Sequence, residues 1–247
     1  MGTLFLSGGG DAGQTQTIDK RFVKELEKDK PLLYIPIAMD TSKFADCFEW
    51  INRLFNPLGI KDITMWTNVK DKSIQDLDDF SAVYIGGGNT FSLLKKFIDT
   101  AFIEVLKGYT ENDGIVYGGS AGAIILGKHI MTCSHMDPNQ VGLNKFNGLE
   151  LVKEYSIWCH YKHENDPLIK KYVKEYKAPV ISLPEETGIL VSDAGIQVIG
   201  TKPAYVYKGQ RKTVIYHDHF IKYGKTLGPI IQAFLCANLF SPHYRTA

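Results

Sequence analysis

The sequence lacks several features that mark specialised classes of protein. Its four cysteines lie far apart and form no C-x-x-C pair, which argues against a disulfide framework or a zinc site and for reduced thiols. No basic segment precedes an apolar one near the start, and no apolar run reaches the roughly 18 residues of a membrane span. The 28 basic and 27 acidic residues leave a net charge of +1 without a basic stripe. We therefore expect a soluble, cytoplasmic protein with neither nucleic acid nor a membrane as partner.

What the sequence does contain is an alternation of short apolar runs with helical patterns. No change of composition divides the chain, so residues 1–247 are expected to form one α/β domain. The alternation predicts right-handed crossovers and a doubly wound, mostly parallel sheet. Strands are expected at 3–6, 31–37, 62–66, 82–85, 115–117, 155–160, 180–183 and 188–191, with antiparallel edge strands at 197–199, 204–207 and 213–216. Helices are expected at 17–28, 43–55, 90–112, 166–176 and 229–240.

The strongest functional signal is the run 116–126. An apolar strand breaks there into Gly-x-Ser-x-Gly, centred on Ser120, and continues as a helix of small residues. This is the sequence form of a nucleophile elbow, in which a sharp turn exposes the serine hydroxyl. Two further glycine clusters, at 7–13 and 86–89, also end strands. Because the carboxyl ends of parallel strands share one edge of a sheet, we expect the three clusters to meet around Ser120.

A serine nucleophile needs a base, an acid that orients the base, and donors for the oxyanion. The glycines at 86–88 end the strand one crossover before Ser120, so the amides of Gly88 and Ala121 are the expected oxyanion donors in a flavodoxin-like sheet. His160 is the favoured base because it ends an apolar strand and should lie at the edge of the sheet. The competing histidines are His129, His135, His163, His217, His219 and His243.

Four carboxylates compete for the role of the orienting acid. Glu185 and Glu186 directly follow another expected strand end. Asp137 lies in the loop after the helix that follows the serine, and Asp193 lies further along the chain. The residues alone leave this choice open.

Three alternatives belong to other functional classes. Ser120, Asp193 and His219 (or His217) have the chain order of an α/β-hydrolase, which would predict an esterase. The loop at 8–13 fits G-x-G-x-x-G after a strand, which would predict a nucleotide-binding domain. A third alternative is a related domain that binds peptides without cutting them. The histidine clusters match no zinc-protease motif, so no metal is expected.

Four motifs in order, at 86–91, 118–123, 159–161 and 183–187, resemble those of the peptidase E and cyanophycinase family of serine peptidases. With the first glycine loop, the resemblance covers roughly residues 3 to 199. It implies a class I glutamine amidotransferase-like fold, a three-layer α/β/α sandwich. It also implies cleavage of peptides next to acidic residues without a metal or cofactor.

The resemblance also implies roles for single residues. It selects Glu185 rather than Glu186 as the orienting acid, with Asp137 as second choice, and makes Asn89 of the first motif the expected substrate-binding residue. The expected partner is a small peptide substrate, and a homodimer is left open. The complete set of implied catalytic residues is Ser120 as nucleophile, His160 as base, Glu185 as orienting acid, and Gly88 with Ala121 as oxyanion donors.

One departure from the family concerns substrate specificity. Family dipeptidases that require an N-terminal aspartate carry an arginine shortly after the histidine, whereas this chain has no arginine between Arg53 and Arg211. Lysines at 162, 170 and 171 occupy that region, and an ammonium group binds a carboxylate without bidentate geometry. The sequence therefore predicts peptide hydrolysis but not a strict requirement for aspartate.

Overall fold

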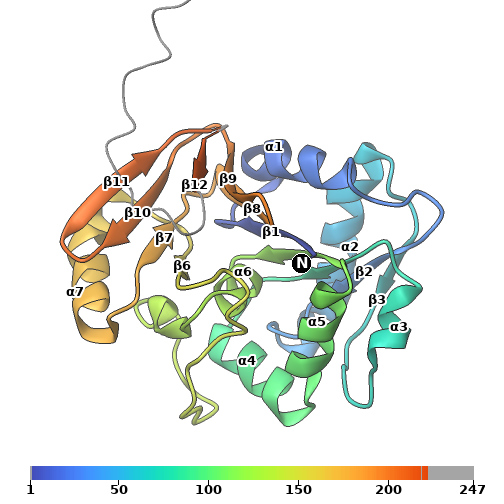
Figure 1. Cartoon of the computed structure of the whole chain (residues 1–247). Helices are drawn as coiled ribbons and strands as arrows, with labels where there is room; N and C mark the ends of the chain where they lie inside the picture. The colour runs from blue at the N-terminus through green and yellow to red at the C-terminus, as the bar shows by residue number, and fades with distance from the viewer. Residues whose placement is uncertain (1, 218, 222–247) are drawn as a thin grey trace, which may run out of the picture.

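The computed structural model describes residues 2–217 and 219–221, so the helix expected at 229–240 and His243 lie outside the described residues. Its centre is an eight-stranded sheet in the order β12-β9-β8-β1-β5-β4-β2-β3 (Figure 1). The strands from β1 to β3 in this order pair in parallel, whereas β8, β9 and β12 extend the sheet with antiparallel pairings. The strand bounds are β1 Thr3–Ser7, β2 Leu32–Ile35, β3 Ile63–Met65, β4 Ala82–Ile85, β5 Ile115–Gly119, β8 Thr187–Ser192, β9 Gly195–Gly200 and β12 Phe220–Ile221.

Helices cover both faces of this sheet, which makes the three-layer arrangement. Successive side chains of β1 alternate between the faces: Leu4 and Leu6 pack in one apolar cluster, and Phe5 packs in the other. The Phe5 face is covered by α1 (Ala12–Val23) and α2 (Phe44–Phe55). The Leu4 face is covered by α3 (Ile74–Asp78), α4 (Thr90–Asp99), α5 (Phe102–Glu111) and α6 (Ala121–Leu126). The doubly wound α/β class is therefore confirmed.

The later part of the chain forms a second sheet, which the sequence did not predict. Four strands pair in the order β11-β10-β7-β6, and α7 (Asp166–Tyr176) packs against them (Figure 1). Of the three expected edge strands, only β9 joins the large sheet, because the chain leaves that sheet after Gly200 through Thr201-Lys202-Pro203. The bounds are β6 Ser156–Trp158, β7 Val180–Ser182, β10 Ala204–Lys208 and β11 Arg211–Ile215.

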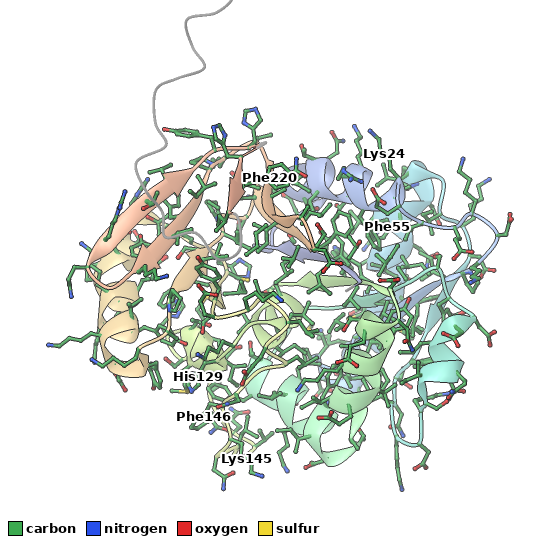
Figure 2. The ribbon with its side chains drawn as sticks, in the orientation of Figure 1. Lys24, Phe55, His129, Lys145, Phe146 and Phe220 are labelled. Carbon is green, nitrogen blue, oxygen red and sulfur yellow. The ribbon has the colours of Figure 1, made fainter. Side chains whose placement is uncertain are left out.

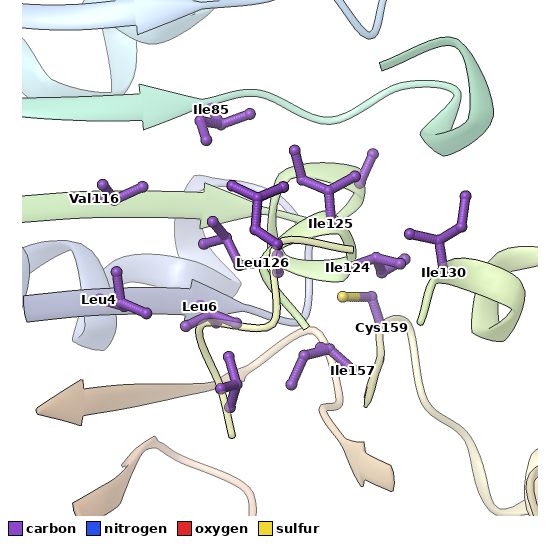
Figure 3. Packing of buried hydrophobic residues seen from close by; sticks show 14 of the residues in the cluster. Leu4, Leu6, Ile85, Val116, Ile124, Ile125, Leu126, Ile130, Ile157 and Cys159 are labelled. Carbon is purple, nitrogen blue, oxygen red and sulfur yellow. The ribbon is translucent and has the colours of Figure 1, made fainter. Parts of the chain in front are cut away.

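Helix α6 joins the two sheets through its apolar side chains. Ile124, Ile125 and Leu126 are buried between β5 and the strand β6 of the second sheet (Figure 3). Cys159 lies in the same cluster, directly before His160. The packing thus fixes the end of β6 close to the turn that precedes α6.

Two expected helices differ in their bounds. The helix expected at 17–28 begins at Ala12, because the Asp11 carboxylate accepts the backbone N–H groups of Gly13 and Gln14 in a capping box. The helix expected at 90–112 is two helices, since the chain turns at Ala101, whose φ is 55°. Short 3₁₀ helices occur at Thr41–Lys43, Asn56–Leu58, Ile130–Cys133 and His163–Asn165.

A long loop follows α6 and returns to β6. It closes on itself at an isolated bridge between His129 and Asn147, next to the aromatic contact of His129 with Phe146 (Figure 2). Asp137 lies within this loop. Among the described residues, no helix combines the length and hydrophobicity that crossing a bilayer would require.

Candidate active site

Three glycine-containing loops meet at the carboxyl edge of the large sheet. The register pairs Ser7 with Gly119 and Ile85 with Gly118, so the ends of β1, β4 and β5 are neighbours. The expected adjacency of the strands before 86–89 and 118–122 is therefore confirmed. Segments from the second sheet reach the same edge, because the His160 backbone N–H donates to Gly8 O at 2.9 Å.

Ser120 occupies the turn between β5 and α6 in an unusual backbone conformation, with φ 50° and ψ −110°. Left-handed φ values strain a residue that carries a Cβ, and such strain is typical of functional sites. Glycines surround the serine because a Cβ at Gly118 would lie 2.6 Å from the Gly122 carbonyl carbon, and one at Gly122 would collide with Ile85 O. Close packing therefore accounts for the Gly-x-Ser-x-Gly pattern.

His160 lies directly beside the serine. Its Nε2 is 2.8 Å from Ser120 Oγ. The residue follows β6 and has a φ of 52°. Gly9, with φ 102°, packs closely against the imidazole, since a Cβ on Gly9 would collide with the ring. The glycine loop at 8–13, which suggested nucleotide binding, thus presents its backbone to His160.

Glu185 holds the other side of the imidazole. Its Oε1 is 2.9 Å from His160 Nδ1, and its Oε2 accepts a hydrogen bond from Gln14 Nε2 at 2.8 Å. The bonds from His160 and then from Gln14 lower the pKa of this carboxyl group below its ordinary value of 4.5. An ionised Glu185 can only accept a hydrogen bond, so it favours the tautomer of a neutral imidazole that carries its proton on Nδ1. In that tautomer Nε2 is the acceptor that faces the serine.

Sequence reasoning missed Gln14. The same side chain accepts the Asp11 N–H through Oε1 at 2.9 Å, so it closes the capping box of α1 and binds Glu185 at once. The capping-box pattern was present in the sequence, but it indicates only where a helix begins.

The other candidate acids have different partners. Glu186 pairs with Lys202, its Oε1 lying 2.7 Å from Nζ. Asp137 Oδ2 accepts the backbone N–H of Thr90 at 2.8 Å, at the first turn of α4. Asn89 caps the same helix by accepting the Ser92 N–H, and its side-chain amide donates to Pro138 O at 2.9 Å. Asp137 and Asn89 therefore connect the loop after α6 to the start of α4.

The structure separates the residues of the α/β-hydrolase alternative. Asp193 lies in the turn between β8 and β9, five residues beyond Gly188, which pairs with Ser7 near the site. At roughly 3.3 Å per residue, Asp193 lies about 17 Å along the sheet from the edge that holds Ser120. His219 directly precedes β12, four strand positions from β5. This arrangement as a serine triad is therefore wrong.

The two expected oxyanion donors lie in two turns that follow the neighbouring strands β4 and β5. Ala121 is the first residue of α6. Gly88, with φ 134°, has no room for a Cβ, which would lie 2.6 Å from the carbonyl of Ala38. A Cβ on the preceding Gly87 would be 3.9 Å from Ser120 Oγ, so this glycine turn faces the hydroxyl at close range.

Two cavities adjoin the candidate catalytic residues, and His160 lines both of them. One of about 200 Å³ reaches Ser120 and Gly87, and one of about 430 Å³ lies beside Glu185 and Tyr205. Within the described residues, no three histidine, cysteine or acidic side chains gather as a metal site would require.

Comparison with known proteins gives a consistent result. The model of peptidase family S51 matches residues 3–199. A peptidase E of Nostoc sp. is 27% identical over 202 residues, 77% of this chain and 81% of the relative. A Drosophila melanogaster protein named as a probable alpha-aspartyl dipeptidase is 26% identical over 196 residues, 74% of this chain and 78% of the relative. The crystal structure of a peptidase from an acI-B1 Actinobacterium superposes with a TM-score of 0.66 at 19% identity, covering 90% of this chain and 97% of that one.

Proposed function

Because the chain belongs to peptidase family S51, whose model matches residues 3–199, we propose that Ser120, His160 and Glu185 are the catalytic residues with which it cleaves short peptides. The protein is a serine-type peptidase of the dipeptidase kind. The observation that supports the residue assignment is the continuous set of contacts from Ser120 Oγ through the imidazole to Glu185, at 2.8 and 2.9 Å.

In the first step, Ser120 Oγ attacks the peptide carbonyl while His160 Nε2 takes the hydroxyl proton. Glu185 stabilises the imidazolium that forms and keeps the ring in the orientation that faces the serine. Gln14 in turn holds the Glu185 carboxylate through its second oxygen. Collapse of the tetrahedral intermediate transfers the proton from Nε2 to the leaving amine and leaves an ester on Ser120. Water, deprotonated by the same Nε2, then hydrolyses the ester.

The oxyanion of each tetrahedral intermediate accepts hydrogen bonds from the N–H groups of Gly88 and Ala121. Both groups belong to turns at the carboxyl edge, and backbone donors held by a rigid turn need no reorganisation during the reaction. The strained φ and ψ of Ser120 support the interpretation of 118–122 as a nucleophile elbow, since strain of this kind lifts the hydroxyl out of the sheet.

The setting we propose is a reducing, cytoplasmic one. Cys47, Cys133 and Cys159 are buried and carry free thiols, as proteins of reducing compartments do.

The decisive experiment compares wild type with Ser120→Ala. Fluorophosphonate labels only an activated serine, so we expect labelling of the wild type and none of the variant. Hydrolysis of a dipeptide panel should fall by several orders of magnitude, judging from losses on the order of 10⁶ when a nucleophile is removed elsewhere. Ser134→Ala is the matched control, because Ser134 lines neither cavity. Normal turnover by Ser120→Ala would show that the assignment is wrong.

A further inference from the structure

The two cavities beside His160 differ in their lining. The smaller one, here called the Trp50 pocket, is lined by glycines, small hydroxyl residues and two aromatic rings: Ser7, Gly9, Gly10, Thr15, Trp50, Tyr84, Gly87, Gly119, Ser120 and His160. The larger one, here called the Lys202 pocket, is richer in charge: Gln14, His160, Tyr161, Lys162, His163, Pro184, Glu185, Glu186, Lys202 and Tyr205.

No lysine or arginine of the described chain lines the Trp50 pocket. Its large side chains include Trp50 and Tyr84, whose ring centroids are 6.2 Å apart with the planes inclined at 67°. The Tyr84 hydroxyl lies close to Gly119, since a Cβ there would be 3.0 Å from it. A side chain in this pocket would therefore meet aromatic carbon and a phenol. The basic group that lines the pocket is the imidazole of His160, which must be neutral to act as the base.

A buried acidic group is bonded to one of the residues that line the Trp50 pocket. Thr15, which lines the pocket, donates its hydroxyl to Asp19 Oδ2 at 2.6 Å. The fully buried Asp19 also accepts the Tyr117 hydroxyl at 2.8 Å. Burial, and then the proximity of Asp19, raise the pKa of the Tyr84 phenol well above its usual value. A substrate carboxylate placed here would be desolvated next to a second carboxylate.

The cations of the Lys202 pocket each have an acidic neighbour. Lys202 Nζ lies 2.7 Å from Glu186 Oε1. Lys162 acts electrostatically on Glu185, where it helps to lower the pKa of that carboxyl group after the bonds from His160 and Gln14.

A third lysine lies just behind the same pocket. Lys212 Nζ is 2.7 Å from Asp166 Oδ2 and donates to the Tyr161 hydroxyl at 2.7 Å. Burial opposes the ionisation of Asp166, but the hydrogen bonds from Lys212, Tyr207 and Tyr161 outweigh burial and hold the pKa of Asp166 at about 2, so its carboxylate stays charged. The positive charges on this side of the site are therefore already compensated within the protein.

We propose that the site prefers peptides whose residue on the acyl side of the cleaved bond is uncharged, and that the Trp50 pocket receives that residue's side chain. The inference rests on the proposed function. The acyl side is assigned to the Trp50 pocket because this cavity contacts Ser120, whose oxygen bonds to the acyl carbon. The same cavity contacts Gly87, which directly precedes the proposed oxyanion donor Gly88. The Lys202 pocket contacts His160 but not Ser120, so it lies toward the leaving amine, which His160 protonates.

An isosteric pair of substrates tests the effect of charge alone. Asn-Leu and Asp-Leu have nearly the same shape, so their ratio of kcat/KM isolates the carboxylate. For the wild type we expect Asn-Leu to be favoured by about tenfold or more, because a site without a counter-charge rejects a desolvated carboxylate. Equal rates, or faster cleavage of Asp-Leu, would overturn the inference.

Variants of this chain test the two parts of the argument separately. Asp19→Asn removes the carboxylate bonded to Thr15 of the Trp50 pocket, and the Asp-Leu to Asn-Leu ratio should rise about threefold or more. Trp50→Ala should lower kcat/KM for Leu-Leu about tenfold while changing that for Ala-Leu less, since only the larger side chain loses contact with the indole. Trp66→Ala is the matched control, because Trp66 packs on Phe80 and lines neither cavity. An unchanged Leu-Leu to Ala-Leu ratio in Trp50→Ala would refute the assignment of the pocket.

Fluorophosphonate labelling separates failure of this inference from failure of the proposed function. If Ser120 is not labelled and no peptide is cleaved, both fail. If Ser120 is labelled and Asp-Leu protects it as well as Asn-Leu does, only the preference for an uncharged residue fails. Stronger protection by Asn-Leu supports the preference independently of turnover.

Discussion

Replacement of Asp19 by asparagine should change how the stability of the protein depends on pH. Asp19 lies on α1 with no solvent exposure, bonded to Thr15 and Tyr117 beneath the active-site loops. Burial raises its pKa from 3.8 to about 6, although the bonds from Thr15 and Tyr117 oppose the change. The folded protein therefore holds a proton that the unfolded chain has already released between pH 4 and pH 6.

The magnitude follows from the shift in pKa. Above the unfolded value of 3.8 the folded state binds more protons than the unfolded state, so the free energy of unfolding falls as the pH rises. The fall ends near the folded pKa of about 6, where both states have lost the proton. A shift of about 2 units at 1.36 kcal/mol each corresponds to a loss of about 3 kcal/mol across this range. Asparagine cannot ionise, so Asp19→Asn should not show this loss.

Urea unfolding of both proteins between pH 4 and pH 7 measures the effect. The free energy of unfolding of the wild type minus that of Asp19→Asn should fall by about 3 kcal/mol from pH 4 to pH 7. Asp99→Asn, at an exposed position paired with Lys95, controls for the loss of an acidic residue in general. Parallel curves for wild type and Asp19→Asn, within about 0.5 kcal/mol, would refute the argument from burial.

Three further predictions concern the candidate catalytic residues. Gly9→Ala should lower kcat by more than tenfold with the fold retained, because the new Cβ would push the imidazole of His160 away. Circular dichroism checks the fold and dipeptide hydrolysis measures kcat, and an unchanged kcat would contradict the prediction. Glu185→Gln should lower kcat by about 10³- to 10⁴-fold while fluorophosphonate labelling slows in parallel, and a loss below tenfold would remove Glu185 from the mechanism. Asp137→Asn should keep kcat within about tenfold and lower the free energy of unfolding by about 1 kcal/mol, since Asp137 accepts the Thr90 N–H at the start of α4. Kinetics and thermal unfolding measure the two effects. A loss of kcat as large as that in Glu185→Gln would reverse the roles of the two acids.

Much of the large sheet could be predicted because its signals are local. Buried parallel strands appear as short apolar runs, and β4 and the helix α7 have the bounds that the sequence predicted. The second sheet could not be predicted in this way. A strand such as β10 is also a short buried run, from Ala204 to Tyr207, but a local hydrophobic pattern does not specify which sheet the strand joins.

The same distinction applies to the candidate site. Ser120 and His160 each follow an apolar strand, so a motif and an element end were enough to select them. Gln14 and Trp50 have no such signal. Gln14 contacts Glu185 across 171 residues of sequence, and its helix shows only a capping pattern. Trp50 lies on the amphipathic helix α2, where a tryptophan is expected to pack in the core.

The choice between Asp137 and Glu185 illustrates what geometry adds to a motif. Both carboxylates lie in loops near the nucleophile, so position in the chain did not separate them. The hydrogen-bond partners of the two carboxylates differ. Glu185 is bonded to His160 Nδ1, whereas Asp137 accepts the Thr90 N–H at the first turn of α4. A helix N-terminus stabilises a carboxylate that remains charged, whereas an acid beside an imidazole must respond to a charge that appears during the reaction. In the proposed mechanism Glu185 contacts that changing charge, and Gln14 holds its second oxygen, so Glu185 can stabilise the imidazolium without moving.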